Sequence, residues 1–406
     1  MTYVEDSTVI DNTIYDLIND AFSKEIESND SKYRNSIFKE HIDYFVKTDD
    51  GSYSIKSKEI NDKVETLHTI SGAISESFEK FIKPLKLNYD EDIAILDICS
   101  GLGYNSSAAI DDFIKNTEDN ENKPNLRIDL LEISKPTLAA GLIVPSPIPA
   151  HDITKKAIEE ELINVGYASL ELEETEIPDN MDLKIHIDDA RKVIQSLPDN
   201  TYDAIFLDPF SQIMSPELLT VDFFNEFRRV IKDNGIVATY TSSSPVRMGF
   251  IEANFYVSLG PIFGRFQGGT LASPSSINLK YSLPKNDELK MALSDVGVPF
   301  RDPNLNWTSE EVIEHRTEER HEVRHNTKIS SAVKTPIFLN QEIEDAPLKR
   351  RVERNLAKMN IPGVLSDEAK YLVEPIDNWQ EEYLEDNNSR TRILEMVKRL
   401  DEIANK

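Results

Sequence analysis

Two glycines stand where an apolar run of the chain gives way to a helical one. The run 93–98 is followed by Gly101 and Gly103, and Tyr104 and Asn105 open a segment whose inner face carries small and apolar residues. Glycines at such a junction let the backbone approach a ligand closely, and the first turn of a helix offers free amide donors. The pattern predicts a nucleotide-like ligand, although a tight strand-to-helix turn without any ligand produces the same pair of glycines.

Acidic residues mark the ends of the first three apolar runs. Asp97 ends the first run and Glu132 the second, where a carboxylate can accept hydrogen bonds from both hydroxyls of a ribose. Asp189, with Ala190, follows the third run, where an aspartate could accept a hydrogen bond from the amino group of adenine. Each carboxylate alone could be a solvated loop residue, but together they favour S-adenosylmethionine as the cofactor. NAD and FAD are disfavoured because Ser106 stands where their fingerprint needs a third glycine.

The fourth apolar run ends in Asp208-Pro209-Phe210, at the edge where open α/β sheets bind their ligands. A carboxylate and a carbonyl fixed by proline could accept hydrogen bonds from an amine nucleophile, and the phenyl ring could stack on a flat ring. Methyl transfer needs the amine lone pair in line with the methyl group, so positioning could matter more than strong base catalysis. We therefore predict Asp208, Pro209 and Phe210 as catalytic residues; a turn that only caps the next helix is the alternative.

Two further motifs could carry chemistry in the last third of the chain. His321 and His325 match the spacing of zinc-protease ligands, but a charged and solvated helix surrounds them, so we expect no metal. Lys349-Arg350-Arg351, with Arg354 and Lys358, forms a basic cluster in an otherwise acidic chain. The cluster could contact RNA phosphates, or it could be a helix face paired with nearby glutamates.

Short apolar runs separated by helical segments begin near residue 92, which is typical of parallel strands joined by crossover helices. Five runs are clear, and further strands are expected near 254–259 and at 270–272 or 277–281. The clear runs are 93–98, 127–133, 183–187, 202–207 and 235–240. The predicted fold is α/β, a Rossmann-like class I methyltransferase sheet of seven strands with the last one antiparallel.

The remaining segments are expected to extend this sheet at both ends of the chain. Apolar spacing predicts an amphipathic helix from Ile10 to Phe22 and another over 70–82, and Asp50-Gly51 suits a two-residue hairpin turn between them. The predicted parts are 1–85, with N-terminal helices and a β-hairpin; 86–282, the methyltransferase domain, with an inserted lid or helical excursion at about 135–181; and 283–406, a charged and mainly helical region.

Composition limits the classes of function. The 406 residues carry a formal net charge of −28, which argues against a general polyanion binder because phosphate affinity depends on Lys and Arg. Any contact with nucleic acid must therefore use a local patch. The single cysteine, Cys99, excludes an internal disulfide and a cysteine-based zinc site. No apolar run approaches bilayer length, and residues 1–6 show neither a basic region nor an apolar signal core, so we expect a cytoplasmic protein.

Several runs of the sequence resemble the MnmC-type methyltransferases, the methyl-transferring half of the enzyme that completes 5-methylaminomethyl-2-thiouridine in tRNA. The similarity extends over about 50–282 and is weaker to about residue 335. The runs that carry it are His68 to Ser77, Leu96-Asp97, Gly101-Leu102-Gly103-Tyr104-Asn105, Leu207-Asp208-Pro209-Phe210-Ser211, Ser215-Pro216-Glu217-Leu218-Leu219-Thr220, Ala238-Thr239-Tyr240-Thr241-Ser242-Ser243, Val246-Arg247-Met248-Gly249-Phe250 and Phe263-Gly264-Arg265.

The resemblance implies S-adenosylmethionine as methyl donor and an exocyclic aminomethyl group on a wobble uridine as acceptor, with tRNA as the partner. It also implies that Asp208 lies nearest the transferred methyl group and that Gly101, Gly103 and Glu132 lie at the cofactor. A cationic amine would suit an acidic pocket, so the argument from the residues and the resemblance agree on this point.

The resemblance also marks two arginines, Arg247 and Arg265, as candidate substrate-binding residues. Members of the family tend to carry further basic residues after the Gly-Arg pair, whereas Phe266 and Gln267 follow Arg265 here. The bifunctional relatives continue into a flavin-dependent oxidase half, and this chain supplies no second glycine-rich dinucleotide loop. It therefore resembles the methyltransferase half alone.

Two other classes of function stay open on the sequence. A methyl- or aminopropyltransferase for a small amine would share the sheet and place carboxylates near the amine, and the acidic composition favours it. A non-catalytic binding protein could retain the fold, but the intact cofactor loop argues against degeneration. A comparison of intact with decarboxylated S-adenosylmethionine as the donor separates the two enzyme classes.

Overall fold

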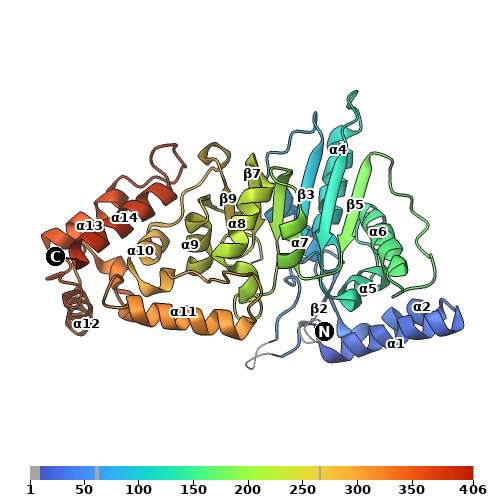
Figure 1. Cartoon of the computed structure of the whole chain (residues 1–406), viewed down its shortest axis with the longest axis horizontal. Helices are drawn as coiled ribbons and strands as arrows, with labels where there is room; N and C mark the ends of the chain where they lie inside the picture. The colour runs from blue at the N-terminus through green and yellow to red at the C-terminus, as the bar shows by residue number, and fades with distance from the viewer. Residues whose placement is uncertain (1–9, 60–63, 265–266, 406) are drawn as a thin grey trace. The chain divides into compact units, whose positions relative to one another are not determined.

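The computed structural model describes residues 10–59, 64–264 and 267–405 (Figure 1). The chain divides into two compact units. Unit one comprises 1–214, 230–240 and 261–268, and unit two comprises 215–229, 241–260 and 269–406. Residues 1–6, on which the expectation of no targeting signal rests, lie outside the described residues.

Unit one contains five parallel strands in the order β5-β4-β3-β6-β7. They are β3 (Ile93–Ile98), β4 (Leu126–Leu131), β5 (Met181–His186), β6 (Tyr202–Leu207) and β7 (Ile231–Thr239). The chain proceeds from β3 through β4 to β5 and then returns to β6 on the other side of β3. The strand order therefore reverses between β3 and β6, which is where open α/β sheets bind their ligands. Both of these strands are almost wholly buried, which explains why each carries only one charged residue.

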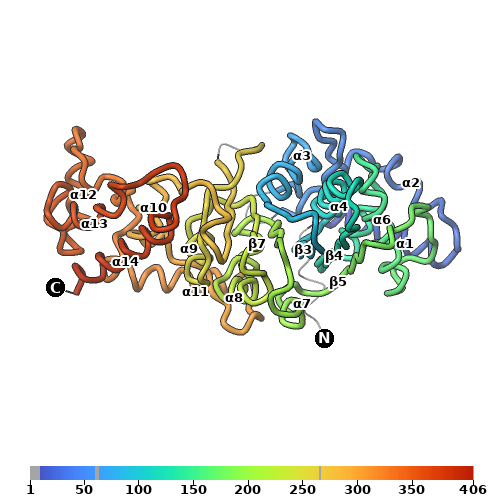
Figure 2. The backbone as a smooth tube through the Cα atoms, turned by 90° about the horizontal axis from the view of Figure 1, so that it is seen from above, coloured from blue at the N-terminus to red at the C-terminus, as the bar shows by residue number. Residues whose placement is uncertain are grey.

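Helices connect these strands and extend unit one at its N-terminus. Figure 1 shows α1 and α2 next to α5 and α6, and Figure 2 shows α1 and α2 beside α6 as well. The helices of unit one are α1 (Asn12–Ser28), α2 (Lys32–Glu40), α3 (Ala73–Ser77) with a π-helical turn (Phe78–Ile82), α4 (Tyr104–Thr117), α5 (Lys135–Ile143), α6 (Ala150–Asn164) and α7 (Ala190–Ser196), with a short 3-10 turn at Ile42–Tyr44. The helices predicted from apolar spacing at 10–22 and 70–82 are thus present, the second one beginning at Ala73.

The hairpin near residue 50 has a wider loop than we predicted. The strands β1 (Phe45–Lys47) and β2 (Tyr53–Ile55) pair antiparallel, so residues 48–52 connect them. Gly51 has the expected positive φ of 87°, but the two-residue turn is wrong because the carboxylate of Asp50 folds back onto the loop. It accepts hydrogen bonds from two hydroxyl side chains and one amide within the loop, which stabilises the wider turn.

A buried arginine joins the N-terminal helices to α6. The guanidinium of Arg34, on α2, donates to Glu25 of α1 at 2.7 Å and to Glu159 of α6 at 2.5 Å, and none of the three side chains is more than 4% exposed. Backbone amides from the segment 169–173 donate to both carboxylates as well. These donors offset the cost of burying two carboxylates against one cation.

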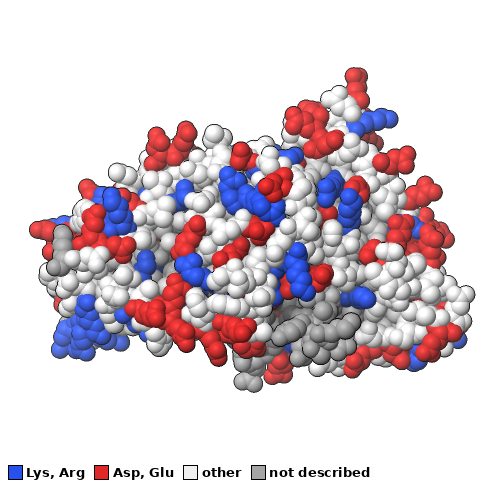
Figure 3. Space-filling view, viewed as in Figure 1, with Lys and Arg blue, Asp and Glu red and all other residues white. Residues whose placement is uncertain are grey.

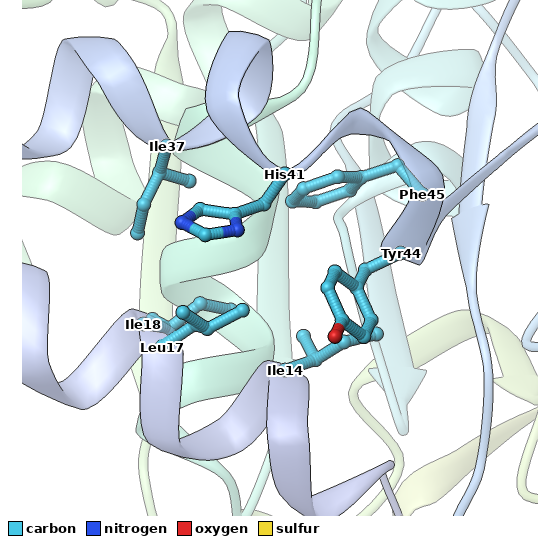
Figure 4. Close-up of a pocket in the computed structure, with 7 residues that line it drawn as sticks. All are labelled: Ile14, Leu17, Ile18, Ile37, His41, Tyr44 and Phe45. Atoms are coloured by element: carbon cyan, nitrogen blue, oxygen red, sulfur yellow. The ribbon is translucent and has the colours of Figure 1, made fainter.

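The helices α1 and α2 also enclose a small apolar pocket (Figure 4). Its lining residues are Ile14, Leu17, Ile18, Ile37, His41, Tyr44 and Phe45. The imidazole of His41 lies among these apolar side chains in Figure 4. None of the predicted site residues lines this pocket, so we assign it to helix packing.

Unit two contains an antiparallel pair of strands and most of the C-terminal helices. The strands are β8 (Tyr256–Leu259) and β9 (Thr270–Ser273). Phe224 stacks on Phe250 inside this unit, with ring centroids 3.9 Å apart. The helices are α8 (Val221–Val230), α9 (Ser244–Glu252), α10 (Lys285–Leu293), α11 (Ser309–Val323), α12 (Ala346–Ala357), α13 (Asp367–Asp377) and α14 (Ser389–Ala404).

The strands follow the order β5-β4-β3-β6-β7-β9-β8, seven in the described part of the chain. The predicted Rossmann-like class I methyltransferase fold with an antiparallel strand at its edge is confirmed. Of the two alternatives for the last strand, 270–272 is correct, whereas 277–281 begins with a 3-10 turn. Over the ranges that the structure describes, no helix is both long and apolar enough to cross a membrane.

Candidate active site

The turn after β3 adopts a backbone conformation that favours glycine. The φ angle is 56° at Gly101 and 84° at Gly103, and Cys99 also has a positive φ of 62°. A Cβ atom on Gly103 would lie 2.7 Å from Cγ2 of Thr154 on α6, so a side chain there would collide. The helix α4 begins directly after Gly103 with no side-chain cap on its first amides, which can therefore donate to an anionic group.

Two helices from the segment 135–181 hold this turn in place. A Cβ atom on Gly141 of α5 would lie only 3.0 Å from the carbonyl oxygen of Leu102. From α6, Nε2 of His151 lies 2.9 Å from the same oxygen, within hydrogen-bond distance. The segment 135–181, for which we expected an inserted lid or helical excursion, contains α5 and α6, and both contact the glycine turn.

His151 is a buried residue that the sequence reasoning missed. Because the carbonyl oxygen of Leu102 can only accept, Nε2 carries the proton and Nδ1 is left as an acceptor. Burial lowers the pKa of His151 to about 3, so the ring is neutral. The ring lies 4.9 Å from that of Tyr104. A lone histidine without ligand spacing gives no signal in the sequence, and the role of His151 depends on packing between distant segments.

Several buried acceptors at the turn have no hydrogen-bond partner among the described residues. They include Oδ1 of Asp97, Oγ of Ser100, Oδ1 of Asn105 and Nδ1 of His151. A buried polar atom without a partner costs free energy, so such atoms indicate a site that a polar ligand completes. S-adenosylmethionine carries an ammonium group and two ribose hydroxyls, and these hydrogen-bond donors would satisfy the acceptors. The residues at the turn therefore fit this cofactor.

Asp97 is completely buried at the end of β3. The hydroxyl of Ser106 donates to its Oδ2 at 2.6 Å. Burial raises the pKa of Asp97 to about 7, and the nearby carboxylate of Glu132 adds to the increase. A cationic ligand would favour the ionised form, so Asp97 could respond to the charge of the bound molecule.

Glu132 lies directly after β4 and is held against the glycine turn. The amide of Gly101 donates to its Oε2 at 3.2 Å, and the amide of Ser134 donates to its Oε1 at 3.0 Å. Burial raises the pKa of Glu132. Both carboxylate oxygens are thus fixed in orientation, at the strand end where we predicted a ribose contact.

Asp189 follows β5 and caps the helix α7, which begins at the buried Ala190. Its Oδ1 accepts a hydrogen bond from the amide of Arg191 at 2.9 Å, and its Oδ2 accepts one from the guanidinium of the same residue at 2.8 Å. These bonds account for the conformation of Asp189 without a ligand. The contacts of Asp189 and Ala190 with adenine stay a prediction.

Asp208 follows β6 and is hydrogen-bonded to α4, the helix that begins after the glycine turn. Its amide donates to the carbonyl of Ile98 on β3 at 3.2 Å, and Nδ2 of Asn105 donates to its Oδ2 at 2.9 Å. Burial raises the pKa of Asp208 to about 6. Pro209 is buried and Phe210 is half-buried. The predicted cofactor residues and the predicted catalytic carboxylate are therefore in direct contact through Asn105.

Three buried titratable side chains interact electrostatically with Asp208, namely His68, Glu76 and Lys80, none more than 9% exposed. Glu76 and Lys80 form an ion pair, and Nδ1 of His68 lies 3.9 Å from Oε2 of Glu76. Burial alone would raise the pKa of Glu76, but His68 and Lys80 outweigh burial and hold that pKa below its usual range. We call these three residues the buried charge cluster.

Sequence reasoning did not place this cluster in the site. His68 and Glu76 lie in a run that resembles the MnmC-type enzymes, but the run carried no catalytic assignment. Glu76 and Lys80 are four residues apart, which on most helices indicates a solvated ion pair. Only the packing of α3 and its π-helical turn shows that both are buried.

The segment before α3 is hydrogen-bonded to the turn that follows β6. The amide of Ser211 donates to Oε2 of Glu65 at 3.1 Å. Gly264 lies against the same segment, because a Cβ atom there would be 2.8 Å from Oγ1 of Thr69. Next to Thr69, Ile70 is 67% exposed.

The two arginines predicted to bind substrate differ in what the structure says of them. Arg265 lies outside the described residues. Arg247 is 1% exposed, and its guanidinium donates to Oγ1 of Thr270 at 2.9 Å, to the carbonyl of Gly269 at 3.1 Å and to Asp287 at 3.0 Å. These bonds fix Arg247 inside unit two, and a role toward a substrate stays a prediction.

The two histidines with zinc-protease spacing do not share a helix face. The helix α11 ends at Val323, and His325 lies beyond it with a φ of 62°. Within the described ranges, no group of three or more His, Cys, Asp or Glu side chains could hold a metal ion.

Comparisons with known proteins agree with this arrangement. A family model described as S-adenosyl-L-methionine-dependent methyltransferase matches residues 151–275. The protein MJ0670 of Methanocaldococcus jannaschii is 33% identical over 316 residues, which cover 77% of this chain and 82% of that protein. The crystal structure of MNMC2 from Aquifex aeolicus is 26% identical with a TM-score of 0.56, and the match covers 75% of this chain and 99% of that one.

Two further relatives match over a shorter part of the chain. The tRNA 5-methylaminomethyl-2-thiouridine biosynthesis bifunctional protein MnmC of Ralstonia nicotianae is 38% identical over 71 residues, 18% of this chain and 11% of that protein. A polyamine aminopropyltransferase of Prochlorococcus marinus is 35% identical over 111 residues, 26% of this chain and 38% of that protein. The family model names the cofactor, and the solved structure of MNMC2 shares the fold. The chain therefore belongs to the MnmC-type family of S-adenosyl-L-methionine-dependent methyltransferases.

Proposed function

We propose that this methyltransferase acts on the amino group of an aminomethyl substituent on a modified wobble uridine in tRNA. The observation that carries the proposal is the hydrogen bond from Asn105 to Asp208, which joins a cofactor turn to a carboxylate suited to an amine. In this proposal, residues 86–282 form the catalytic domain and the protein works in the cytoplasm. The partial match to MnmC of Ralstonia nicotianae supports the choice of acceptor.

The proposed site would position an amine by accepting its hydrogen bonds. S-adenosylmethionine, when bound, supplies a methyl group on a sulfonium. Asp208 would accept an N–H of the amine and orient the lone pair toward that methyl, while Pro209 restricts the turn that carries the carboxylate. As the N–C bond forms, the C–S bond breaks, and the resulting ammonium loses one proton. Asp208 has a pKa of about 6, so its carboxylate can accept that proton and pass it to solvent.

The charge around Asp208 suits a cationic acceptor. Glu76 and Lys80 form an ion pair whose formal charges cancel, so an ionised Asp208 adds a negative charge that this pair does not neutralise. An aminomethyl group is protonated in neutral water, and this negative charge favours its entry. The entering ammonium must lose one proton before its lone pair can attack the methyl group, and the carboxylate of Asp208 can accept that proton and pass it to solvent.

The proposal is tested by incubating the protein with labelled S-adenosylmethionine and tRNA that carries the aminomethyl group. We expect label in the wobble nucleoside after digestion, identified by chromatography and mass spectrometry. Binding of S-adenosylhomocysteine, measured by calorimetry, shows that the cofactor site is intact. Absence of label in tRNA from a protein that binds S-adenosylhomocysteine would contradict the choice of acceptor.

A second candidate is transfer of a methyl or aminopropyl group to a small amine. The partial match to a polyamine aminopropyltransferase and the net charge of −28 favour it. Supplying decarboxylated S-adenosylmethionine with a diamine in place of tRNA separates the two. Aminopropyl transfer faster than methyl transfer to tRNA would favour this second candidate.

A further inference from the structure

The helix α12 exposes a row of cations on one face. Arg350, Arg351, Arg354 and Lys358 are all exposed. At about 100° per residue, these four positions fall within an arc of about 100° around the helix axis. The opposite side of α12 carries its buried residues, among them Val352 and Leu356. Lys and Arg side chains gather over the place of α12 in Figure 3.

This face stands out because two of its arginines, Arg351 and Arg354, have no side-chain partner among the described residues. Of the other arginines that the structure describes, Arg228 takes part in a further interaction, and each of the rest has a hydrogen-bond or ion-pair partner for its side chain. The chain carries 73 Asp and Glu residues, so unpaired arginines are unusual in it. Lys349 points elsewhere around the helix and lies 4.0 Å from Glu353. The sequence left open that this cluster is a helix face paired with nearby glutamates, and Arg351 and Arg354 do not form such pairs among the described residues.

A neighbouring histidine responds to the positive charge at this end of α12. Nζ of Lys358 lies 3.3 Å from Nε2 of His325. Partial burial lowers the pKa of His325, and the charges of Lys358 and Arg324 lower it further. An anion bound here would reverse that contribution, since it would favour the protonated imidazole.

We propose that Arg350, Arg351, Arg354 and Lys358, the α12 basic face, bind the phosphate backbone of the RNA substrate. The proposal rests on the proposed function, because it supplies the local patch that an acidic chain needs in order to bind tRNA. Arg350, Arg354 and Lys358 follow one another at intervals of four residues, so they advance by about 6 Å per step along the helix. Such a row can contact successive phosphates, and guanidinium groups bind phosphate oxygens in pairs.

The composition of α12 favours nucleic acid over a membrane. A helix that binds a lipid surface presents large apolar side chains beside its cations, and none of the exposed large apolar residues of the described ranges lies on α12. An acidic protein segment would also complement the cations, so an acidic peptide is one of the ligands to be measured.

The test uses the full chain with Arg350, Arg351 and Arg354 changed to Gln together with Lys358→Gln. The matched control changes Lys24, Lys83, Lys115 and Lys192 to Gln, because these are exposed lysines that already pair with a carboxylate four residues earlier in the chain. Both variants lose four positive charges. Affinities for tRNA, for a poly-glutamate peptide and for anionic vesicles are measured by fluorescence anisotropy at several KCl concentrations. Thermal unfolding and S-adenosylhomocysteine binding show that each variant is folded.

We expect the α12 variant to bind tRNA at least tenfold more weakly than the control variant at low salt. The slope of log affinity against log salt should also become shallower by about 0.7 to 0.9 for each phosphate that the variant no longer neutralises. Equal affinity and slope in the two variants would overturn the inference, as would weaker binding confined to the acidic peptide or the vesicles. Methyl transfer by the unchanged protein is measured separately. The proposed function can therefore fail while this inference holds, and this inference can fail while the proposed function holds.

Discussion

The side-chain amide of Asn105 donates a 2.9 Å hydrogen bond to Oδ2 of Asp208. Asn105 lies in the first turn of α4, directly after the glycine turn, whereas Asp208 follows β6. The contact spans the point where the strand order reverses, so it couples the conformation of the cofactor turn to the orientation of the carboxylate.

Replacing Asp208 should remove catalysis and leave cofactor binding. For Asp208→Ala we expect kcat to fall by about 100-fold or more, the size typical of a positioned acid–base group. The Kd for S-adenosylhomocysteine should change by less than about tenfold, because the hydrogen bond that Asn105 loses is worth about 1 kcal/mol, or about a fivefold change in Kd. Single-turnover methyl transfer and calorimetry measure the two effects. Unchanged turnover would remove Asp208 from the mechanism.

The pH dependence of methyl transfer should follow the ionisation of Asp208. Its pKa is raised to about 6, and the reaction needs the carboxylate, so kcat/KM should decrease as the pH falls through about 6. Lys80 lowers the pKa of both Asp208 and Glu76, so Lys80→Met should move the acidic limb to higher pH.

Lys83→Met is the matched control for this shift, because Lys83 is 62% exposed and pairs with Glu79 on the same helical segment. We expect its pH profile to coincide with that of the unchanged protein. A limb at the same pH in both variants, with Lys80→Met folded by circular dichroism, would show that the buried charge cluster does not act on the carboxylate.

Asp97→Asn should stabilise the protein above neutral pH. The pKa of Asp97 is about 7 in the folded protein against its ordinary value of 3.8, so the folded state binds a proton more tightly than the unfolded state does. Stability contributed by this group is therefore present at acidic pH and is lost as the pH rises from about 4 to about 7.

The gain from Asp97→Asn should thus grow over that interval and stay constant above it, with an upper limit of about 4 kcal/mol at about 1.36 kcal/mol per pKa unit. Denaturant unfolding at pH 5 and pH 8 measures it, and S-adenosylhomocysteine should bind the variant more weakly. A gain that is equal at both pH values would contradict the assigned burial of an ionisable Asp97.

Gly103→Ala should disturb the cofactor turn more than its backbone angle alone explains. Gly103 has a φ of 84°, and a Cβ atom there would lie 2.7 Å from Thr154. Gly166 provides the control, since its φ is 70° and nothing lies within 4 Å of a Cβ atom placed on it. Gly166→Ala should cost about 1 to 2 kcal/mol of unfolding free energy from backbone strain, and Gly103→Ala should cost more and weaken cofactor binding. Thr154→Ser, added to Gly103→Ala, should recover part of that difference; no recovery would exclude the collision.

Much of the sheet could be predicted from the sequence because burial on both faces leaves a simple signature. The runs 93–98 and 202–207 coincide with β3 and β6, in each of which one acidic residue stands among apolar ones. The hairpin turn was wrong because a side chain, Asp50, determines the loop. The turn pattern predicts only the backbone angles of two residues, and it does not include the hydrogen bonds that the side chain of Asp50 makes.

The parts of the site that escaped prediction depend on contacts between distant segments. His151 meets Leu102 across 49 residues of sequence, and no local spacing records such a contact. Lys80 and Glu76 are spaced like a surface ion pair, and only tertiary packing buries them. The glycines and the strand-end acids were predictable because their chemistry is local to one turn each.

The helix α6 contacts two places at once. Its first turn, through His151, supports the cofactor turn, and its later part, through Glu159, holds Arg34 and with it α1 and α2. A rigid rod held at both ends transmits a change at one end to the other. Cofactor binding should therefore slow amide hydrogen exchange in α1 and α2. We expect these N-terminal helices, although distant in sequence from every motif, to contribute to the affinity for the methyl donor.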